Sequence, residues 1–225
     1  MRALAPFRGP LGVILLLGTL ALGGAAPRAA AAGQEERVGN FSAGDLAGWK
    51  TQEFQGQTRY DLVRGPHGKV LFAQSDGTAG GLYREVSVDL KVTPVLNWSW
   101  KVRNILEKGN AWTKEGDDFP ARVYVIFDAF FPWNRTSICY VWANRLPKGE
   151  FTGNPFAPDN VKTLAVESGP ALVGRWVTEA RNVPEDYRRL FQEEPPPVRG
   201  VAVMTDTDQT GGEAEAWYGD ISFSQ

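Results

Sequence analysis

A strict alternation of apolar and polar side chains, with a period of two residues, is the feature that most constrains the fold of this chain. Residues 95–102 alternate in this way, with two tryptophans on the apolar side. Residues 121–128 follow a tight acidic turn and alternate apolar side chains with Arg122 and Tyr124. Because successive side chains of a strand point to opposite faces of its sheet, each segment predicts a strand with one core face and one polar face.

Short strands of this kind recur along the chain, about ten in all, and a single helix interrupts them. The helix is predicted near 183–191, where Asn182 can cap the first turn and acidic residues precede arginines. A first strand is expected around 38–41, and a long loop is expected at 151–159, which contains two prolines. Many short strands separated by turns predict an all-β fold, an antiparallel β-sandwich of jelly-roll type.

The first 32 residues have the three-part layout of a secretory signal peptide. A basic start is followed by an apolar run at 11–22 and by small residues that end at Ala32. The apolar run is about twelve residues long, short of the roughly twenty that a membrane-spanning helix needs. We therefore expect 1–32 to be a cleaved signal peptide and 33–225 to be a single β-sandwich domain. This domain would be periplasmic or secreted, with no stable membrane span after cleavage; an uncleaved anchor is the second interpretation.

The charge argues against a nucleic-acid partner, and the cysteine content excludes an intrachain disulfide. The formal charge is −2, and cleavage after Ala32 would make it −5, because three arginines and no acidic residue are removed. Nucleic-acid binding needs a basic footprint, so this mild acidity argues against a nucleic-acid partner. Cys139 is the only cysteine, so an intrachain disulfide is excluded and the core must be held by packing.

Common catalytic motifs are absent from the sequence, which has no nucleophile elbow, zinc-protease helix, phosphate loop or dinucleotide fingerprint. Carboxylates remain, and two of them at a suitable separation could perform glycoside chemistry as acid and base. The candidates for a carbohydrate-active hydrolase or lyase are Asp118, Asp128, Glu179 and Asp206. The other interpretation is that such acids cap turns or pair with arginines across strands, so the sequence leaves enzymatic activity open.

One loop is similar to the front of a calcium-binding loop. Asp206, Asp208 and Thr210 alternate and are followed by Gly211, a pattern that can gather oxygens around a hard cation. The closing glutamate twelve positions into such a loop is missing, because Trp217 stands there. Asp206, Asp208 and Thr210 are therefore the metal candidates, with a structural calcium ion as the only cofactor considered. A strand-connecting turn with side-chain hydrogen bonds is the alternative.

The polar faces of three predicted strands are the candidate ligand-binding surface. Amides, charged side chains and hydroxyls can hold sugar hydroxyl groups, and flat aromatic rings can lie against the apolar faces of sugar rings. The predicted ligand-binding residues are Lys101, Arg122, Tyr124, Glu179 and Arg181. The aromatic residues considered as platforms are Trp112, Trp133, Tyr140 and Trp142. Ordinary solvated surface is the alternative for such a face.

Several blocks of sequence together resemble an exported bacterial family catalogued as the domain of unknown function numbered 3047. The blocks lie at 116–127, 140–143, 181–187 and 201–208, and the resemblance covers roughly 41–223. It implies export and a compact domain, with no established activity and no functional residues to carry over. The segments 41–49 and 217–223 more loosely resemble the ends of jelly-roll carbohydrate-binding modules, an analogy of fold that does not establish function.

Together these features predict a secreted or periplasmic β-sandwich that binds a ligand, with carbohydrate or cell-envelope glycan as the expected partner. A carbohydrate-active hydrolase or lyase is the first alternative. A structural protein of the cell envelope is the second.

Overall fold

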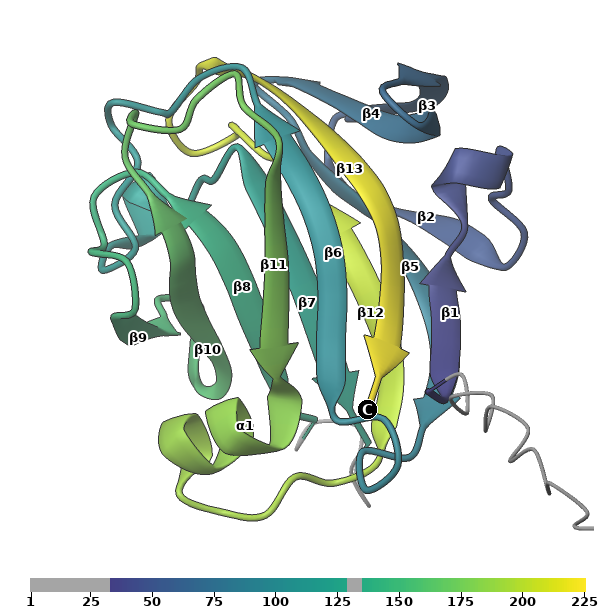
Figure 1. Cartoon of the computed structure of the whole chain (residues 1–225). Coiled ribbons are helices and arrows are strands. Elements are labelled where there is room, and N and C mark those ends of the chain that lie inside the picture. The colour runs from purple at the N-terminus through teal and green to yellow at the C-terminus, as the bar shows by residue number, and fades with distance from the viewer. Residues whose placement is uncertain (1–32, 129–134) are drawn as a thin grey trace, which may run out of the picture. The chain divides into compact units, whose positions relative to one another are not determined.

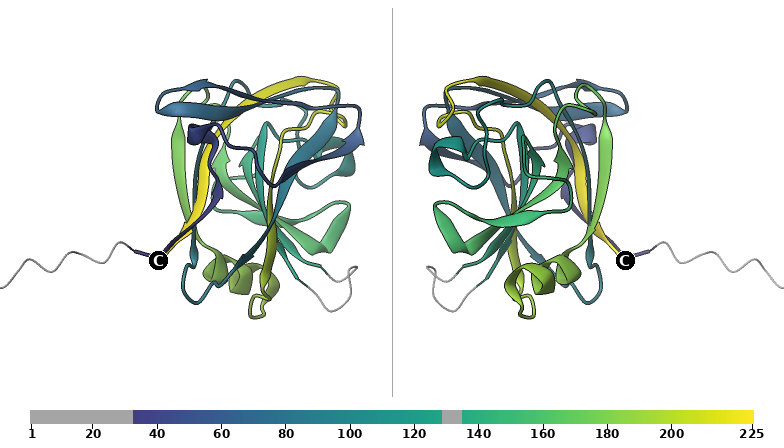
Figure 2. Two further views of the ribbon diagram at one scale, coloured as in Figure 1. Left: turned by 90° about the vertical axis from the view of Figure 1, so that its right-hand side faces the viewer. Right: turned by 90° about the vertical axis from the view of Figure 1, so that its left-hand side faces the viewer.

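The computed structural model describes residues 33–128 and 135–225, and the predicted signal peptide therefore lies outside the described residues. The described part consists of two β-sheets packed face to face, as the alternation of side chains predicts (Figure 1). Views at right angles to the first show the sheets as two layers (Figure 2). In the ranges described, no helix is both long and apolar enough to cross a membrane.

The first sheet has six strands, and all of its pairings are antiparallel. Its order is β11-β6-β13-β4-β3, with β1 also paired to β13. These strands are β1 (Glu35–Gly39), β3 (Arg59–Gly65), β4 (Gly68–Asp76), β6 (Val95–Val102), β11 (Val177–Asn182) and β13 (Glu213–Ser224). A short 3-10 helix, η1 (Phe41–Ala43), follows β1.

The second sheet has seven strands in the order β2-β5-β12-β7-β8-β10-β9. Its pairings are antiparallel except for the parallel pair of β8 and β10. These strands are β2 (Trp49–Gln55), β5 (Ala79–Val88), β7 (Ala121–Phe127), β8 (Ser137–Ala143), β9 (Phe151–Asn154), β10 (Ala157–Ser168) and β12 (Val198–Met204). A 3-10 helix, η2 (Lys114–Gly116), precedes β7.

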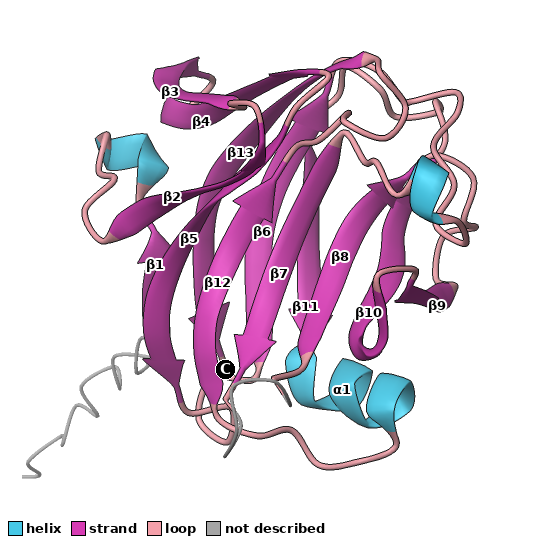
Figure 3. Cartoon of the chain, turned by 180° about the vertical axis from the view of Figure 1, so that it is seen from behind, coloured by secondary structure: helices cyan, strands magenta, loops and turns pink. Residues whose placement is uncertain are grey.

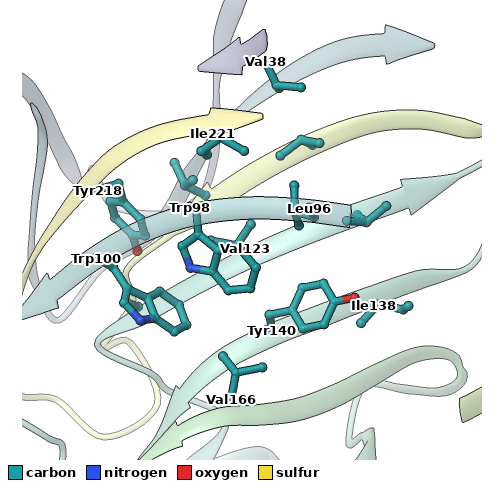
Figure 4. Packing of buried hydrophobic residues seen from close by; sticks show 14 of the residues in the cluster. Val38, Leu96, Trp98, Trp100, Val123, Ile138, Tyr140, Val166, Tyr218 and Ile221 are labelled. Carbon is teal, nitrogen blue, oxygen red and sulfur yellow. The ribbon is translucent and has the colours of Figure 1, made fainter. Parts of the chain in front are cut away.

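The core lies between the sheets and is built from the inward faces predicted by the alternation. Four alternate residues of β7 are fully buried there, and Leu96, Trp98, Trp100 and Val102 of β6 are buried with them. Trp98 packs with its ring centroid 5.4 Å from that of Trp100 and 5.4 Å from that of Tyr140, which reaches it from the other sheet (Figure 4). Aromatic contacts therefore join the two layers.

The predicted helix is present as α1 (Val183–Phe191). The side chain of Asn182 accepts a hydrogen bond from the backbone N–H of Glu185, and Pro184 lies in the first turn. Tyr187 and Leu190 are buried, and the ring of Tyr187 lies 4.6 Å from that of Phe127. The helix thus covers one end of the sandwich with its apolar side.

One prediction of local structure is wrong, and the bounds of another are shifted. The expected loop at 151–159 is a hairpin of β9 and β10. Its prolines do not prevent pairing, because Pro155 lies in the turn and Pro158 in the stretch where the register skips from Ala157 to Lys162. The first strand, expected at 38–41, is β1, and Phe41 instead begins η1.

Candidate functional site

The outer face of the seven-stranded sheet is hollowed into a groove. Two adjoining hollows, of about 430 Å³ and about 370 Å³, share Phe54, Tyr124 and Met204 in their walls. We call the two together the sheet groove. Figure 3 looks onto this face and shows β2 and β9 at opposite sides of it.

The floor of the sheet groove follows from the register of three neighbouring strands. Ala202 of β12 lies opposite Tyr83 of β5 and opposite Tyr124 of β7, so these residues form one row. In the next row Met204 lies between Gly81 and Arg122. A Cβ atom at Gly81 would lie 2.8 Å from the carbonyl oxygen of Val203, too close for any larger residue. The floor therefore has a small residue between two tyrosines in one row and a glycine beside Met204 in the next.

Two exposed phenylalanines stand at the sides of the sheet groove. Phe54 of β2 is 68 % exposed, and Phe156, in the turn between β9 and β10, is 55 % exposed. Both line the larger hollow. Such exposure of large apolar rings beside a hollow is typical of a binding surface. Neither residue could be singled out from the sequence, because the place of each ring depends on which edge strands flank the sheet.

Arg122 points to the outer side of the sheet, as predicted, but it is only 2 % exposed. Its Nε donates a hydrogen bond of 2.8 Å to Oδ1 of Asp206, and a second nitrogen donates to Oδ2. It also donates to the carbonyl oxygen of Asp117 and, at 3.4 Å, to the hydroxyl of Tyr124. The guanidinium is thus committed to neighbouring groups and holds Tyr124 in the floor of the groove.

Burial governs the ionisation of this cluster. It raises the pKa of Tyr124 well above the usual value for a tyrosine, although Arg122 acts in the opposite direction. It also raises the pKa of Asp206 to about 7, against the attraction of the guanidinium. The thiol of Cys139 lies beneath the same face, and burial raises its pKa to about 12. Cys139 is therefore an inert thiol.

The metal candidates lie beside the larger hollow. Asp206 and Asp208 come together as the sequence predicts, and Asp118 joins them: one carboxylate oxygen from each lies within 4.8 Å of the others. Asp118 also accepts hydrogen bonds from the backbone N–H groups of Gln209 and Thr210. Oδ1 of Asp208 and the hydroxyl of Thr210 are buried without a hydrogen-bond partner in the described part of the chain. Because Arg122 already occupies both oxygens of Asp206, the calcium site remains a prediction.

The five predicted ligand-binding residues do not form one patch. Arg122 and Tyr124 belong to the seven-stranded sheet, whereas the other three belong to the six-stranded sheet. Lys101 points outward there, with Nζ 3.8 Å from the ring centre of Trp217. Glu179 is buried, and Arg181 donates two hydrogen bonds to Asp186 of α1. Sharing an alternation pattern does not place residues on one sheet, and whether any of the five contacts a ligand stays a prediction.

The four candidate catalytic carboxylates do not open together onto one hollow. Asp118 and Asp206 are close to each other, but both are buried, and only Asp206 lines the sheet groove. Glu179 lies on the other sheet, and Asp128 follows the opposite end of β7. Burial and the nearby Glu167 raise the pKa of Glu179 to about 7. These four residues therefore lack the pair of carboxyl groups facing one cleft that glycoside hydrolysis needs.

The predicted aromatic platforms are also placed differently. Tyr140 and Trp142 are fully buried in the core, because their strand is covered on both faces. Trp112 is 53 % exposed but does not line either hollow of the sheet groove. Trp133 lies outside the described residues.

Comparisons with known proteins agree with the family resemblance. No curated protein matches the chain. Among solved structures, a family 11 carbohydrate-binding module from Clostridium thermocellum is similar at 10% identity and a TM-score of 0.47, covering 84% of this chain and 94% of that one. The xyloglucanase domain of NopAA from Sinorhizobium fredii is similar at 13% identity and a TM-score of 0.46, covering 80% and 96%. Identities and TM-scores this low say nothing about the ligand or activity of this chain. A family model described as "Protein of unknown function (DUF3047)" matches residues 47–222, so the chain belongs to this family.

Proposed function

We propose that the chain is an exported glycan-binding protein that holds a carbohydrate chain in the sheet groove. The observation that carries the proposal is the pair of exposed rings, Phe54 and Phe156, beside a floor that includes the small residues Gly81 and Ala202. Exposed rings can lie against the apolar faces of sugars, and small floor residues admit a sugar ring close to the sheet.

Polar groups around the sheet groove supply the other half of sugar recognition. Gln52 lines the smaller hollow, whereas Gln209 lines the larger one. Amides can both donate to and accept from hydroxyl groups, which suits a ligand that offers both. Because the two hollows adjoin, they suit successive sugar units of one chain.

Tyr124 is the residue of the originally predicted set that suits this role best. It lines both hollows, and its hydroxyl is held by Arg122. In this proposal Arg122 positions Tyr124 and does not itself contact the glycan. The layout of residues 1–32 supports export to the periplasm or beyond the cell, where envelope glycans are found.

Retention on immobilised polysaccharides tests the proposal. Phe54→Ala and Phe156→Ala should each weaken retention, because they remove a ring without touching the core. Trp112→Ala is the matched control, since it removes another exposed ring that does not line the groove. Full retention by both phenylalanine variants would refute the site. Failure of the unaltered protein to bind any of a broad panel would favour a structural envelope protein instead.

A further inference from the structure

The six-stranded sheet carries a separate hollow of about 350 Å³ on its own outer face, the face turned toward the viewer in Figure 1. Its floor is formed by outward side chains of the adjacent strands β11, β6 and β13, and its walls include the turn between β3 and β4 and the helix η1. We call it the second hollow. It shares no lining residue with the sheet groove.

A β-bulge shapes this floor. Tyr218 lies opposite Trp100 and Ile221 lies opposite Trp98, so Gly219 and Asp220 together face the single residue between those tryptophans, Ser99. A Cβ atom at Gly219 would lie 2.2 Å from the hydroxyl oxygen of Ser99. Bulges redirect side chains locally and are frequent beside functional sites. Here the bulge and its glycine make room for the Ser99 hydroxyl.

The bulge also fixes one carboxylate at the rim. Asp220 accepts hydrogen bonds from the backbone N–H of Ser42, at 2.7 Å, and from the Ser42 hydroxyl. These bonds hold η1 beside the hollow. The carboxylate is therefore an ordered acceptor within the wall.

The indole of Trp176 lies on the side of the second hollow opposite Asp220. Trp176 precedes β11, lines the second hollow and is half-buried. The ammonium group of Lys101 lies 5.9 Å from its ring centre and 3.8 Å from that of Trp217. Lys101, predicted to contact a ligand, thus sits between two indoles and does not line the hollow.

The chemistry of the lining identifies the class of ligand. Most of its polar groups are neutral amides and hydroxyls that both donate and accept, namely those of Asn97, Ser99, Thr178 and Ser222. Asp220 and Lys69 supply one charge of each sign to the lining, to which His67 also belongs, so the charges favour neither a dedicated cation site nor an anion site. Neutral polar groups beside the indole of Trp176 suit a polyhydroxylated molecule such as a sugar. A volume of about 350 Å³ lies at the lower end of the range for small-ligand sites, roughly 300–1,000 Å³.

We propose that the second hollow is a binding site for a short carbohydrate, independent of the sheet groove. The two sites lie on opposite outer faces of the sandwich. A protein with both can hold two glycans at once and gain avidity for a surface or network that presents many copies.

The indole N–H signal of Trp176, observed by NMR on the purified protein, reports directly on this site. The probes are glucose, galactose, mannose, N-acetylglucosamine and their β-linked disaccharides at millimolar concentrations. Trp176→Phe assigns the signal. We expect at least one of these sugars to shift it saturably, and Thr178→Val to weaken the binding at least about tenfold without altering the thermal unfolding temperature.

Phe54→Ala separates the two sites. The shift at Trp176 should persist in this variant with unchanged affinity, whether or not the sheet groove binds glycan. The proposal is overturned if no sugar in the panel shifts the signal, if Thr178→Val leaves the affinity unchanged, or if Phe54→Ala abolishes the shift.

Discussion

Replacing Arg122 by methionine should show how much the free energy of unfolding depends on the charges buried beneath the sheet groove. The side chains of Arg122 and Asp206 are each 2 % exposed, and the guanidinium contacts both carboxylate oxygens. Removing one partner of a buried ion pair strands the other charge and typically costs about 3–5 kcal/mol. Methionine fills much of the same space, which limits the contribution of a cavity. We therefore expect the free energy of unfolding to fall by about 3–5 kcal/mol at pH 8.

The loss should be smaller at low pH, because the stranded carboxyl can take a proton. Burial raises the pKa of Asp206 to about 7 even beside Arg122, and removal of the guanidinium should raise it further. A carboxyl with a raised folded-state pKa stabilises the fold below its unfolded pKa of about 3.9, and that stability is lost as the pH rises through the folded pKa. At about 1.4 kcal/mol for each pKa unit, the deficit of the variant should be about 1–2 kcal/mol smaller at pH 5 than at pH 8.

Urea unfolding followed by tryptophan fluorescence at both pH values measures these quantities. Arg122→Met/Asp206→Asn should recover only part of the loss at pH 8. It removes the stranded charge of Asp206, but the buried carboxylate of Asp117, 3.5 Å from Arg122 in the unaltered protein, stays without its partner. Arg59→Met is the control, since Arg59 pairs with Asp61 in an exposed ion pair worth less than about 1 kcal/mol. The reasoning is refuted if Arg122→Met costs no more than Arg59→Met, or if its cost is the same at both pH values and the double variant is no better.

Three further predictions concern other parts of the fold. Burial raises the pKa of Glu179 to about 7, so the stability that its carboxyl group contributes is lost as the pH rises through 7. Glu179→Gln should flatten that decline and, in urea unfolding at pH 8, raise the free energy of unfolding by about 1–3 kcal/mol. Equal pH profiles of stability for the variant and the unaltered protein would contradict this. Calcium should raise the thermal unfolding temperature, a chelator should reverse the change, and Asp208→Asn should abolish it; the metal prediction fails if calcium has no effect on the unaltered protein. Gly219→Ala should lower the free energy of unfolding by about 1–3 kcal/mol, because the added methyl group would clash with the hydroxyl of Ser99. Ser99→Gly in the same chain should restore most of this stability. No loss of stability in Gly219→Ala alone would show that the bulge tolerates a side chain.

The strands and the core could be predicted because their signal is local. The alternation around Trp98 and Trp100 fixes which side chains face inward, and the cap at Asn182 marks the start of α1. The hairpin that begins in 151–159 could not be predicted in this way, because a segment with two prolines has the sequence pattern of a loop. Only the register of β9 against β10 shows that neither proline removes a needed hydrogen bond.

The sheet groove could not be predicted because it depends on non-local pairing. Tyr83, Tyr124 and Ala202 are far apart in sequence and meet only through the register of β5, β12 and β7. Lys101 and Arg122 have the same outward position in their own strands, yet they belong to different sheets. Alternation assigns a side chain to a face of its strand, whereas the order of strands decides which faces become one surface.

Calorimetric titration with oligosaccharides of increasing length tests the central claim most directly. If a glycan chain lies in the sheet groove, affinity should rise with length until both adjoining hollows are filled and then level off. The heat-capacity change should be negative, because apolar ring surface is buried. In a Thr178→Val background, which weakens the second hollow, the length-dependent binding should need Phe54, which lines both hollows of the sheet groove. Phe54→Ala should then weaken this binding at least about tenfold, while Trp112→Ala leaves it unchanged. Absence of any length-dependent binding, or length-dependent binding that Phe54→Ala leaves intact in the Thr178→Val background, would contradict the account.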